Sequence, residues 1–447
     1  MWRLAIGVAA AVLSLQLLPA ECKTFQITKE LSIGTSLCPG QPNTNVPWTG
    51  TPTLVKEVAN GSLYTVGEDD DLIYVLHVYG TPYDMGYAHG TLLKDSALHV
   101  MTSFYNEIVT EYEQNLNFLP KDVADLIARL GVDGALDLTY LLTERYTPAY
   151  FYEEMRGLAD ASGIDYILLR RVHMIPELIK AGCSMLGAWG SAIVDPLGML
   201  QVRALDFDTT ASLQDAPTVV VYHPDEGNVF ANVGWAGWIA SISGMSSKGI
   251  AMSEKHGEMP FGEESRVGIP FNFLIRDILQ FDDSLEDALW RIQEAHRTCS
   301  IWLGVGDGNM KAFRLVEYSY STFEIFDDKN VTKVNESRFN TEGCNDTCYQ
   351  NYAMSDLAYW GVHLGCWNEV LRATYGSLSP ATVIQLLGLV QTGDLHAIVY
   401  DLAGLKMYVS NARAVNEAGP DNAYDRKYVE LDMSQLFQVP KPSLVRG

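Results

Sequence analysis

The sequence predicts an α+β protein in which helices cover β-sheets within one body. Residues 91–180 carry apolar side chains at three- and four-residue spacing, as amphipathic helices do. From Gly182 to about 255 the chain changes to short apolar runs separated by Gly, Pro and Asp, which is typical of strands. Helical and strand patterns then alternate again, and neither an internal repeat nor a low-complexity linker divides the chain.

The individual elements follow from these patterns in chain order. Residues 21–70 are rich in Gly, Pro, Thr and Asn and predict an irregular lead-in. A turn near Gly80 runs into the first helix. Helical period returns at 270–296 and again at about 380–390. Strands are predicted at 72–78, 192–194, 200–203, 218–222, 249–253, 301–305, 312–318, 396–402 and 405–410.

Composition limits the classes of function. A chain of 447 residues would allow about three domains at ~150 residues each, although large enzymes often keep one core at this length. Hydrophobic residues make up 47%, which is enough for a sizeable core. The 31 basic and 55 acidic residues give a net charge of −24. So acidic a chain repels phosphate backbones, which argues against nucleic acid as a partner.

The first twenty residues predict a secretory signal peptide. A short basic start at Met1-Trp2-Arg3 precedes an apolar run from Leu4 to Leu18, and Ala20 fits a cleavage site. The less favoured alternative is an uncleaved anchor. No later stretch reaches about 18 apolar residues, so no integral membrane span is predicted, while transient contact with a lipid surface stays open. We therefore expect a secreted or lysosomal glycoprotein. Its glycosylation sequons begin at Asn60, Asn330, Asn335 and Asn345.

Cysteine usage agrees with an oxidising compartment. Seven cysteines favour disulfides and leave one odd thiol as a candidate reactive group. The sequence does not reveal the pairing. The seven are Cys22, Cys38, Cys183, Cys299, Cys344, Cys348 and Cys366.

Several common catalytic motifs are missing from the sequence. There is no G-x-S-x-G, no H-E-x-x-H and no paired C-x-x-C, and the nine histidines show no metal spacing. Gly304-Val305-Gly306-Asp307-Gly308 imitates a nucleotide loop but fits a tight turn between strands better. Neither a cofactor nor a metal is implied.

Cys183 stands at the start of the strand-rich part, and Arg203 and Asp206 lie on the predicted return strand of a hairpin. This arrangement would place a cation and a carboxylate beside a thiol. The cation favours the thiolate and so lowers the thiol pKa from its usual ~8.5. Taken alone, the pattern is weak, because a bland hairpin with a core cysteine and a surface ion pair would look the same.

Four blocks in order resemble the N-terminal-nucleophile (Ntn) hydrolases of the C45 acyltransferase and acid-ceramidase type. They are Gly80 to Gly90, Met155 to Asp160 leading to Gly182-Cys183-Ser184, Arg203 to Phe207, and Gly304 to Gly308 followed by Val316-Glu317. The likeness is greatest to the secreted acid-ceramidase-like proteins of amoebae and related protists, and it spans roughly residues 72–435. It implies a four-layer αββα sandwich of two stacked antiparallel sheets flanked by helices.

The resemblance also implies an inactive precursor that cleaves itself. The Cys183 thiol would attack the carbonyl of Gly182, where glycine tolerates an unusual φ. After a signal peptide at 1–20, cleavage would leave an α chain of 21–182, mostly helical, and a catalytic β chain of 183–447. The two would remain associated as one body.

The family's residue roles carry over by position. The new α-amino group of Cys183 would titrate near ~7.7–8.0 and serve as general base, so one residue supplies both nucleophile and base. Arg203 is expected to stabilise the thiolate and contact substrate, and Asp206 to orient the amine. Glu254 matches a family acidic residue on a following hairpin. Asn330 is the first candidate for the oxyanion donor, although it is also a sequon, and Asn232 competes with it.

Other features of the resemblance bear on the substrate pocket. Arg297 is a further candidate site cation, with a structural salt bridge as the favoured alternative. The spacing from Cys183 to Arg203 is a little longer than expected for the ceramidase branch, so pocket shape does not carry over. Candidate pocket aromatics, for which core packing is the commoner role, are Trp189, Trp235, Trp238 and Phe261.

The leading function is hydrolysis of a linear amide, an N-acyl amine or fatty amide, through a thioester on Cys183. The partner is then a small or lipid-like amide. Three alternatives remain open: acyl transfer to an amine at the same site, a phospholipase-B-like lipid esterase, and a catalytically inactive secreted binding protein. An unrelated Cys–His protease is less favoured, because no partnering histidine is evident.

Overall fold

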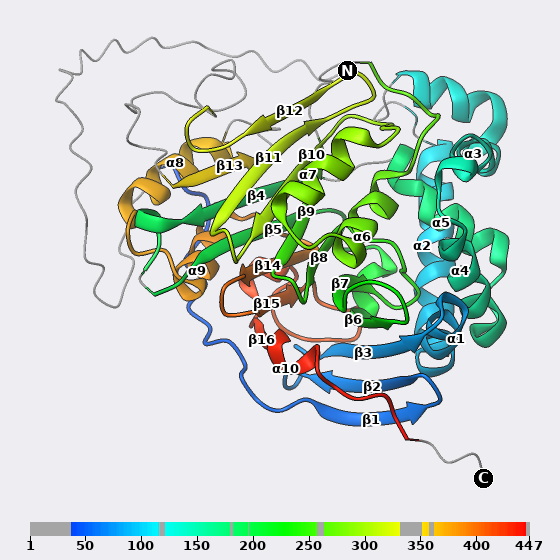
Figure 1. The fold of residues 1–447 in the computed structure, drawn as a ribbon, viewed down its shortest axis with the longest axis horizontal. Coiled ribbons are helices and arrows are strands. Elements are labelled where there is room, and N and C mark those ends of the chain that lie inside the picture. The colour runs from blue at the N-terminus through cyan, green and yellow to red at the C-terminus, as the bar shows by residue number, and fades with distance from the viewer. Residues whose placement is uncertain are drawn as a thin grey trace.

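Two β-sheets stack face to face in the middle of the protein (Figure 1). The structure is a computed structural model and describes residues 37–114, 116, 121–178, 182–194, 196–256, 263–330, 351–356 and 362–443. Within these residues, one sheet has ten strands in the order β1-β2-β3-β6-β7-β8-β9-β10-β11-β12. Their bounds are Thr53–Val58, Gly61–Val66, Ile73–Gly80, Pro217–Pro224, Phe230–Trp235, Ser243–Ser246, Ile250–His256, Ile301–Asp307, Ala312–Tyr318 and Phe323–Phe326.

The second sheet carries the predicted nucleophile. Its described strands follow the order β13-β4-β5-β14-β15-β16, and all its neighbouring pairs run antiparallel. In that order the bounds are Tyr352–Asp356, Gly182–Trp189, Met199–Asp206, His396–Asp401, Lys406–Asn411 and Val429–Asp432.

Helices cover the outer faces of both sheets. Seven described helices share one hydrophobic core with the outer face of the ten-stranded sheet: α1 Pro82–Leu92, α2 Lys94–Gln114, α3 Lys121–Thr143, α4 Ala149–Ser162, α5 Tyr166–Leu178, α6 Phe271–Phe281 and α7 Leu285–Glu294. On the opposite side, α8 Val362–Thr374 and α9 Pro380–Val390 cover the second sheet, as Figure 1 shows. A short helix, α10 Met433–Leu436, follows β16. The predicted α+β class and helix–sheet–sheet–helix order are confirmed.

Strand β6 shows how one alternating sequence serves two cores. Val219 and Val221 belong to the cluster between the sheets, whereas Val220 and Tyr222 belong to the cluster beneath the helices. Side chains of a strand point alternately to its two faces, so a strand covered on both sides must be apolar throughout. This explains the continuous apolar run at 219–222.

The sheets come very close where glycines replace side chains. A Cβ at Gly187 of β4 would lie 2.0 Å from the Phe313 ring, and a Cβ at Gly304 of β10 would lie 2.9 Å from the same ring. Phe313 of β11 therefore fills space that both glycines leave empty. This contact fixes β4, and with it Cys183, against the ten-stranded sheet.

The structure corrects four details of the sequence prediction. Residues 53–66 are not irregular, because β1 and β2 form a hairpin there. Residues 192–194 do not form a strand; Ile193 makes an isolated bridge after a single 3₁₀ turn. β3 and β6 pair in parallel, which the long crossover through the helices permits. Gly182 has no positive φ and lies in β4.

Some predictions fall outside the described residues. These are the signal peptide at 1–20, the sequons at Asn335 and Asn345, and Cys22, Phe261, Cys344 and Cys348. Cys38 and Cys366 form a disulfide. Among the helices that the structure describes, none is both long and apolar enough to span a bilayer.

Candidate active site

The predicted hairpin of Cys183, Arg203 and Asp206 is present as β4 and β5. Cys183 pairs with Leu205 across the antiparallel strands, Gly182 with Asp206, and Met185 with Arg203. Directly opposed residues share a face of the sheet. Cys183 and Arg203 therefore point toward the ten-stranded sheet, while Asp206 stands at the strand end beside the Gly182–Cys183 bond.

Arg203 is held between the sheets by Glu254 of β9. Its Nη2 donates to Glu254 Oε1 at 2.6 Å, and the Arg203 side chain is 0% exposed. A buried guanidinium is tolerated only when a carboxylate balances its charge. Nε and Nη1 of Arg203 have no hydrogen-bond partner among the described residues. The cation is thus fixed at one end and leaves two donor groups for another acceptor.

Asp206 is surrounded by donors from the turn after α9. Its Oδ2 accepts from Thr392 Oγ1 at 3.0 Å, and its Oδ1 accepts from the backbone N–H of Gly393 at 2.5 Å and of Asp394 at 3.3 Å. Ser184 Oγ lies 2.8 Å from Thr392 Oγ1. Hydrogen bonds from the turn after α9 therefore fix the orientation of the Asp206 carboxylate.

Burial dominates the chemistry of the Cys183 thiol in the uncut chain. The residue is 0% exposed, and burial raises its pKa well above the usual range. The charge of Arg203 acts in the predicted direction and lowers this pKa, but the desolvation outweighs it, and Glu254 and Asp206 raise the pKa further. The prediction of a lowered thiol pKa is thus wrong for the uncut chain, in which the thiol stays protonated.

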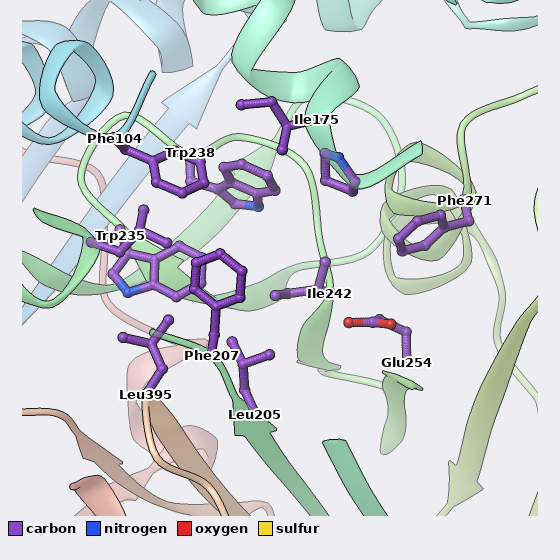
Figure 2. A pocket seen from close by; sticks show the side chains of 12 residues that line it. Phe104, Ile175, Leu205, Phe207, Trp235, Trp238, Ile242, Glu254, Phe271 and Leu395 are labelled. Atoms are coloured by element: carbon purple, nitrogen blue, oxygen red, sulfur yellow. The ribbon is translucent and has the colours of Figure 1, made fainter. Parts of the chain in front are cut away.

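An apolar cavity adjoins this cluster. It holds about 580 Å³ of space, counting the part open to solvent. Its described lining residues are Phe104, Ile175, Pro176, Leu205, Phe207, Leu213, Trp235, Trp238, Ile242, Glu254, Phe271 and Leu395. Of these Glu254 alone is charged, and Figure 2 shows it beside Phe271, with Trp235, Trp238 and Phe104 on the far side.

The cavity is connected to the hairpin through two of its lining residues. Leu205 is the direct cross-strand neighbour of Cys183, and Glu254 is the partner of Arg203. An apolar group in the cavity would therefore lie next to the strand that carries the thiol. Cavities of a few hundred Å³ with apolar walls and few polar groups suit small-molecule ligands.

The two asparagine candidates hold local structure. Asn232 of β7 is buried, and its Nδ2 donates to the Ala240 carbonyl at 3.1 Å. Asn330 lies in the turn after β12, where its Nδ2 donates to the Ile325 carbonyl at 2.9 Å and its Oδ1 accepts from the Asp327 N–H at 2.6 Å. These contacts lie outside the cluster of Cys183, Arg203 and Asp206. The choice of oxyanion donor stays a prediction.

Two further predicted residues also lie in structural roles. Arg297 donates to the backbone carbonyls of Ser319 at 2.8 Å and Gln293 at 2.5 Å, so it holds the end of α7 rather than a carboxylate. Trp189, at the end of β4, packs against the core between the sheets and does not line the cavity.

Sequence reasoning missed the residues that hold Asp206. Thr392, Gly393 and Asp394 connect α9 to β14, and the sequence signals only a turn there. Burial, with the charges of Asp206 and Asp425, raises the pKa of Asp394 to about 7. Nothing local in the sequence announces that this turn reaches the start of β4.

Comparison with known proteins gives two close relatives. The protein dcd1A of Dictyostelium discoideum is 38% identical over 422 residues, which cover 90% of this chain and 94% of dcd1A. This chain belongs to the dcd1 family. Another member, dcd1B of the same organism, is 36% identical over 411 residues, 88% of this chain and 80% of its own. No protein-family model matches the chain. The acid-ceramidase-like character of this family stays a prediction.

Solved structures resemble the chain only weakly. An N-acylethanolamine-hydrolyzing acid amidase ortholog of Caenorhabditis elegans has a TM-score of 0.37 at 13% identity and covers 49% of this chain and 93% of its own. Penicillin V acylase of Agrobacterium tumefaciens has a TM-score of 0.31 at 12% identity, covering 57% and 80%. Scores this low carry no conclusion about function, so the chemistry depends on this chain's own residues.

Proposed function

We propose that the chain is a secreted or lysosomal Ntn amidohydrolase that cleaves itself at Gly182–Cys183 and hydrolyses linear amides with an apolar acyl group. One observation carries the proposal: a buried thiol at a strand start has a paired guanidinium and an oriented carboxylate on the neighbouring strand, beside an apolar cavity. The three groups match the nucleophile, cation and orienting carboxylate that such an enzyme needs.

Self-cleavage follows from the position of the thiol. Cys183 Sγ attacks the Gly182 carbonyl carbon, the C–S bond forms, the C–N bond breaks, and the freed nitrogen takes the proton. Water then splits the thioester, leaving a carboxylate on Gly182 and a thiol and an amine on Cys183. A Cβ at Gly182 would lie at ordinary contact distance, 3.4 Å, from Asp206 Cβ. The new amine would form beside that carboxylate.

Turnover repeats this chemistry with an external amide. The α-amino group titrates near ~7.7–8.0, so it can accept the thiol proton near neutrality. The thiolate attacks the substrate carbonyl, and the ammonium returns its proton to the departing amine. Water attacks the acyl thioester in the same way and releases the acid. Arg203 supports the negative charge on sulfur, and the cavity takes the acyl group.

Mass analysis combined with a substrate panel tests this proposal. Intact-mass measurement after secretory expression should give two chains, the second beginning at Cys183. The purified protein should release free acid from fatty acyl amides. Added amine should leave the product unchanged, because acyl transfer would divert it to a new amide. An uncut chain that hydrolyses neither amides nor lipid esters would leave only the binding-protein alternative.

The Cys38–Cys366 disulfide leads to a separate prediction. It joins the segment before Gly182 to helix α8 after it. Cleavage would therefore leave both chains covalently linked. We expect one band near full length on a non-reducing gel and two bands after reduction, whereas the double variant Cys22→Ala, Cys38→Ala, which removes both cysteines of residues 21–182, should give two bands under both conditions. Two bands from the wild type without reductant would contradict this linkage.

A further inference from the structure

The loop between β7 and β8 forms one wall of the cavity. We call residues 235–242 the tryptophan loop; Trp235, Trp238 and Ile242 within it all line the cavity. The loop has little regular structure of its own, and one internal backbone hydrogen bond is described, from Trp238 N to the Trp235 carbonyl at 3.0 Å. Backbone hydrogen bonds anchor it at Ala236, whose N–H donates to the Ala216 carbonyl, and at Ser241, whose N–H donates to the Asn272 carbonyl, both at 3.0 Å. Between these two anchors, the side chains around the loop hold its backbone.

Two buried histidines supply that support. His89 Nε2 accepts from the Gly237 N–H at 2.9 Å, and His173 Nε2 accepts from the Ile239 N–H at 3.0 Å. The Trp238 ring also stacks on the His173 ring, with centroids 5.0 Å apart and planes 25° apart. Both histidines precede Cys183, on α1 and α5, so the part that would become the α chain holds a wall built from the β chain.

The histidines remain acceptors at acidic pH. Burial, reinforced by the charge of Arg276, lowers the pKa of His89 to about 3 and, despite an opposing hydrogen bond to Leu169, that of His173 to about 4. His173 Nδ1 lies 2.7 Å from the Leu169 carbonyl, so it carries the proton and leaves Nε2 to accept. The loop can thus stay in place across the pH range of a secretory or lysosomal compartment.

Arg276 of α6 gives the tryptophan loop a third side-chain contact. Its Nη1 donates to the Ile239 carbonyl at 2.6 Å, and its Nη2 pairs with Glu154 of α4 at 2.5 Å. Arg276 and Glu154 are each about 1% exposed. Ile239 is therefore held at both its N–H and its carbonyl by side chains from α5 and α6.

Glycines in the first two sequence blocks allow the helices that carry these supporting residues to come close together. A Cβ at Gly86 would lie 2.0 Å from the Glu154 carbonyl oxygen, and a Cβ at Gly157 would lie 2.2 Å from the Tyr83 carbonyl oxygen. Only glycine permits α1 and α4 to approach so closely. This approach brings His89 to the loop and Glu154 to Arg276, which gives a structural reason for the first two sequence blocks.

We infer that His89 and His173 are positioning residues that set the tryptophan wall and thereby the acyl selectivity of the cavity. The inference rests on the proposed function for its substrate class. It assigns to the α-chain segment a role in choosing the acyl group, although the nucleophile belongs to the β-chain segment. The ligand expected at this wall is a long, unbranched or aromatic acyl chain.

Paired variants test the inference. His89→Leu and His173→Leu remove the acceptor, whereas His89→Gln and His173→Gln keep an amide oxygen near the Nε2 position. With fatty acyl aminocoumarin amides of increasing chain length, the leucine variants should still self-cleave and keep kcat on the shortest chain. Their KM for the longest chain should rise roughly 10- to 100-fold, as expected when a buried N–H loses its acceptor. The glutamine variants should restore KM for the longest chain to a value near that of the wild type.

Controls separate this role from mere stability. His99→Leu, at an exposed position on α2, should behave as the wild type. Equal losses on all chain lengths, or equal losses in the leucine and glutamine variants, would overturn the inference. If the leucine chains do not fold, Trp238→Leu must change the chain-length preference by itself, and an unchanged preference would also overturn it.

A binding measurement keeps the inference distinct from the proposed function. Long-chain fatty acid should quench tryptophan fluorescence in the wild type, and His173→Leu should weaken that binding while His173→Gln retains it. If the wild type hydrolyses no amide, the proposed function is wrong, but the binding of fatty acid by the wild type and the two His173 variants still tests the inference. Identical fatty-acid binding by all three proteins would contradict the inference and leave the proposed function unaffected.

Discussion

Cys183→Ala is expected to give a single uncut chain without amide turnover. The residue supplies both the thiol that would attack the Gly182 carbonyl and the amine that would act as base, so its loss removes two functions at once. Removing a nucleophile that works as a unit with its base typically lowers kcat by roughly 10⁶-fold. Intact mass and release of free acid from a fatty acyl amide would measure the two effects.

Cys299 provides the matched control for this substitution. It is also a buried cysteine, just before β10, and its Sγ lies 4.0 Å from Glu177 Oε1. Cys299→Ala should still be cut and should still turn over substrate. The assignment of the nucleophile would be wrong if Cys183→Ala were cleaved at the same bond, or if the uncut variant kept normal activity.

Local sequence patterns predicted the strands that carry the nucleophile because these strands are apolar and lie between clear turn residues. Helix α9 was predicted for similar reasons. Ser379 caps its first turn, Pro380 occupies the first helical position, and Gln391 ends it with a φ of 59°. Such signals depend only on neighbours in sequence, so a single sequence reveals them.

Strand β1 shows where this reasoning stops. Five of its six residues are exposed, and Lys56 and Glu57 interrupt any apolar alternation. A strand at the edge of a sheet can be stabilised by backbone pairing with one neighbour, without burying a face. No periodicity then marks it, which is why residues 53–58 resemble an irregular lead-in.

Contacts across long sequence separations account for the rest of the site. Thr392 and Gly393 lie 186 and 187 residues after Asp206, yet they donate to its carboxylate. The effect of Arg203 on the pKa of the Cys183 thiol could also not be predicted in full from the sequence. The sign of the charge effect follows from the residue types, but the balance against burial depends on packing between two sheets.

Arg203→Met is expected to damage both stability and chemistry. Glu254 would lose its Arg203 partner, and breaking a buried ion pair in this way typically costs about 3–5 kcal/mol in the free energy of unfolding. The thiol would also lose the main positive charge that favours its ionised form. We expect self-cleavage and turnover to fall by roughly 10²–10³-fold, judged by losses of comparable electrostatic groups.

The second buried ion pair separates these two losses. Arg276→Met likewise leaves a buried carboxylate, Glu154, without its cation, but this pair belongs to the tryptophan loop rather than to the thiol. It should lower the denaturant midpoint to a similar extent while self-cleavage continues. If both variants lost cleavage in proportion to stability, the role of Arg203 in the chemistry would reduce to holding the fold.

The double variant Arg203→Met, Glu254→Leu separates the effect of Arg203 on stability from its effect on the reaction of Cys183. Apolar residues in place of a buried ion pair are often neutral or stabilising, so the unfolding free energy should return close to that of the wild type. The thiol would then lie in a stable site that lacks the Arg203 guanidinium, and the chain should remain uncut. A stable double variant that cleaved itself at the normal rate would show that Cys183 reacts without Arg203, and Arg203 would lose its proposed role beside the sulfur.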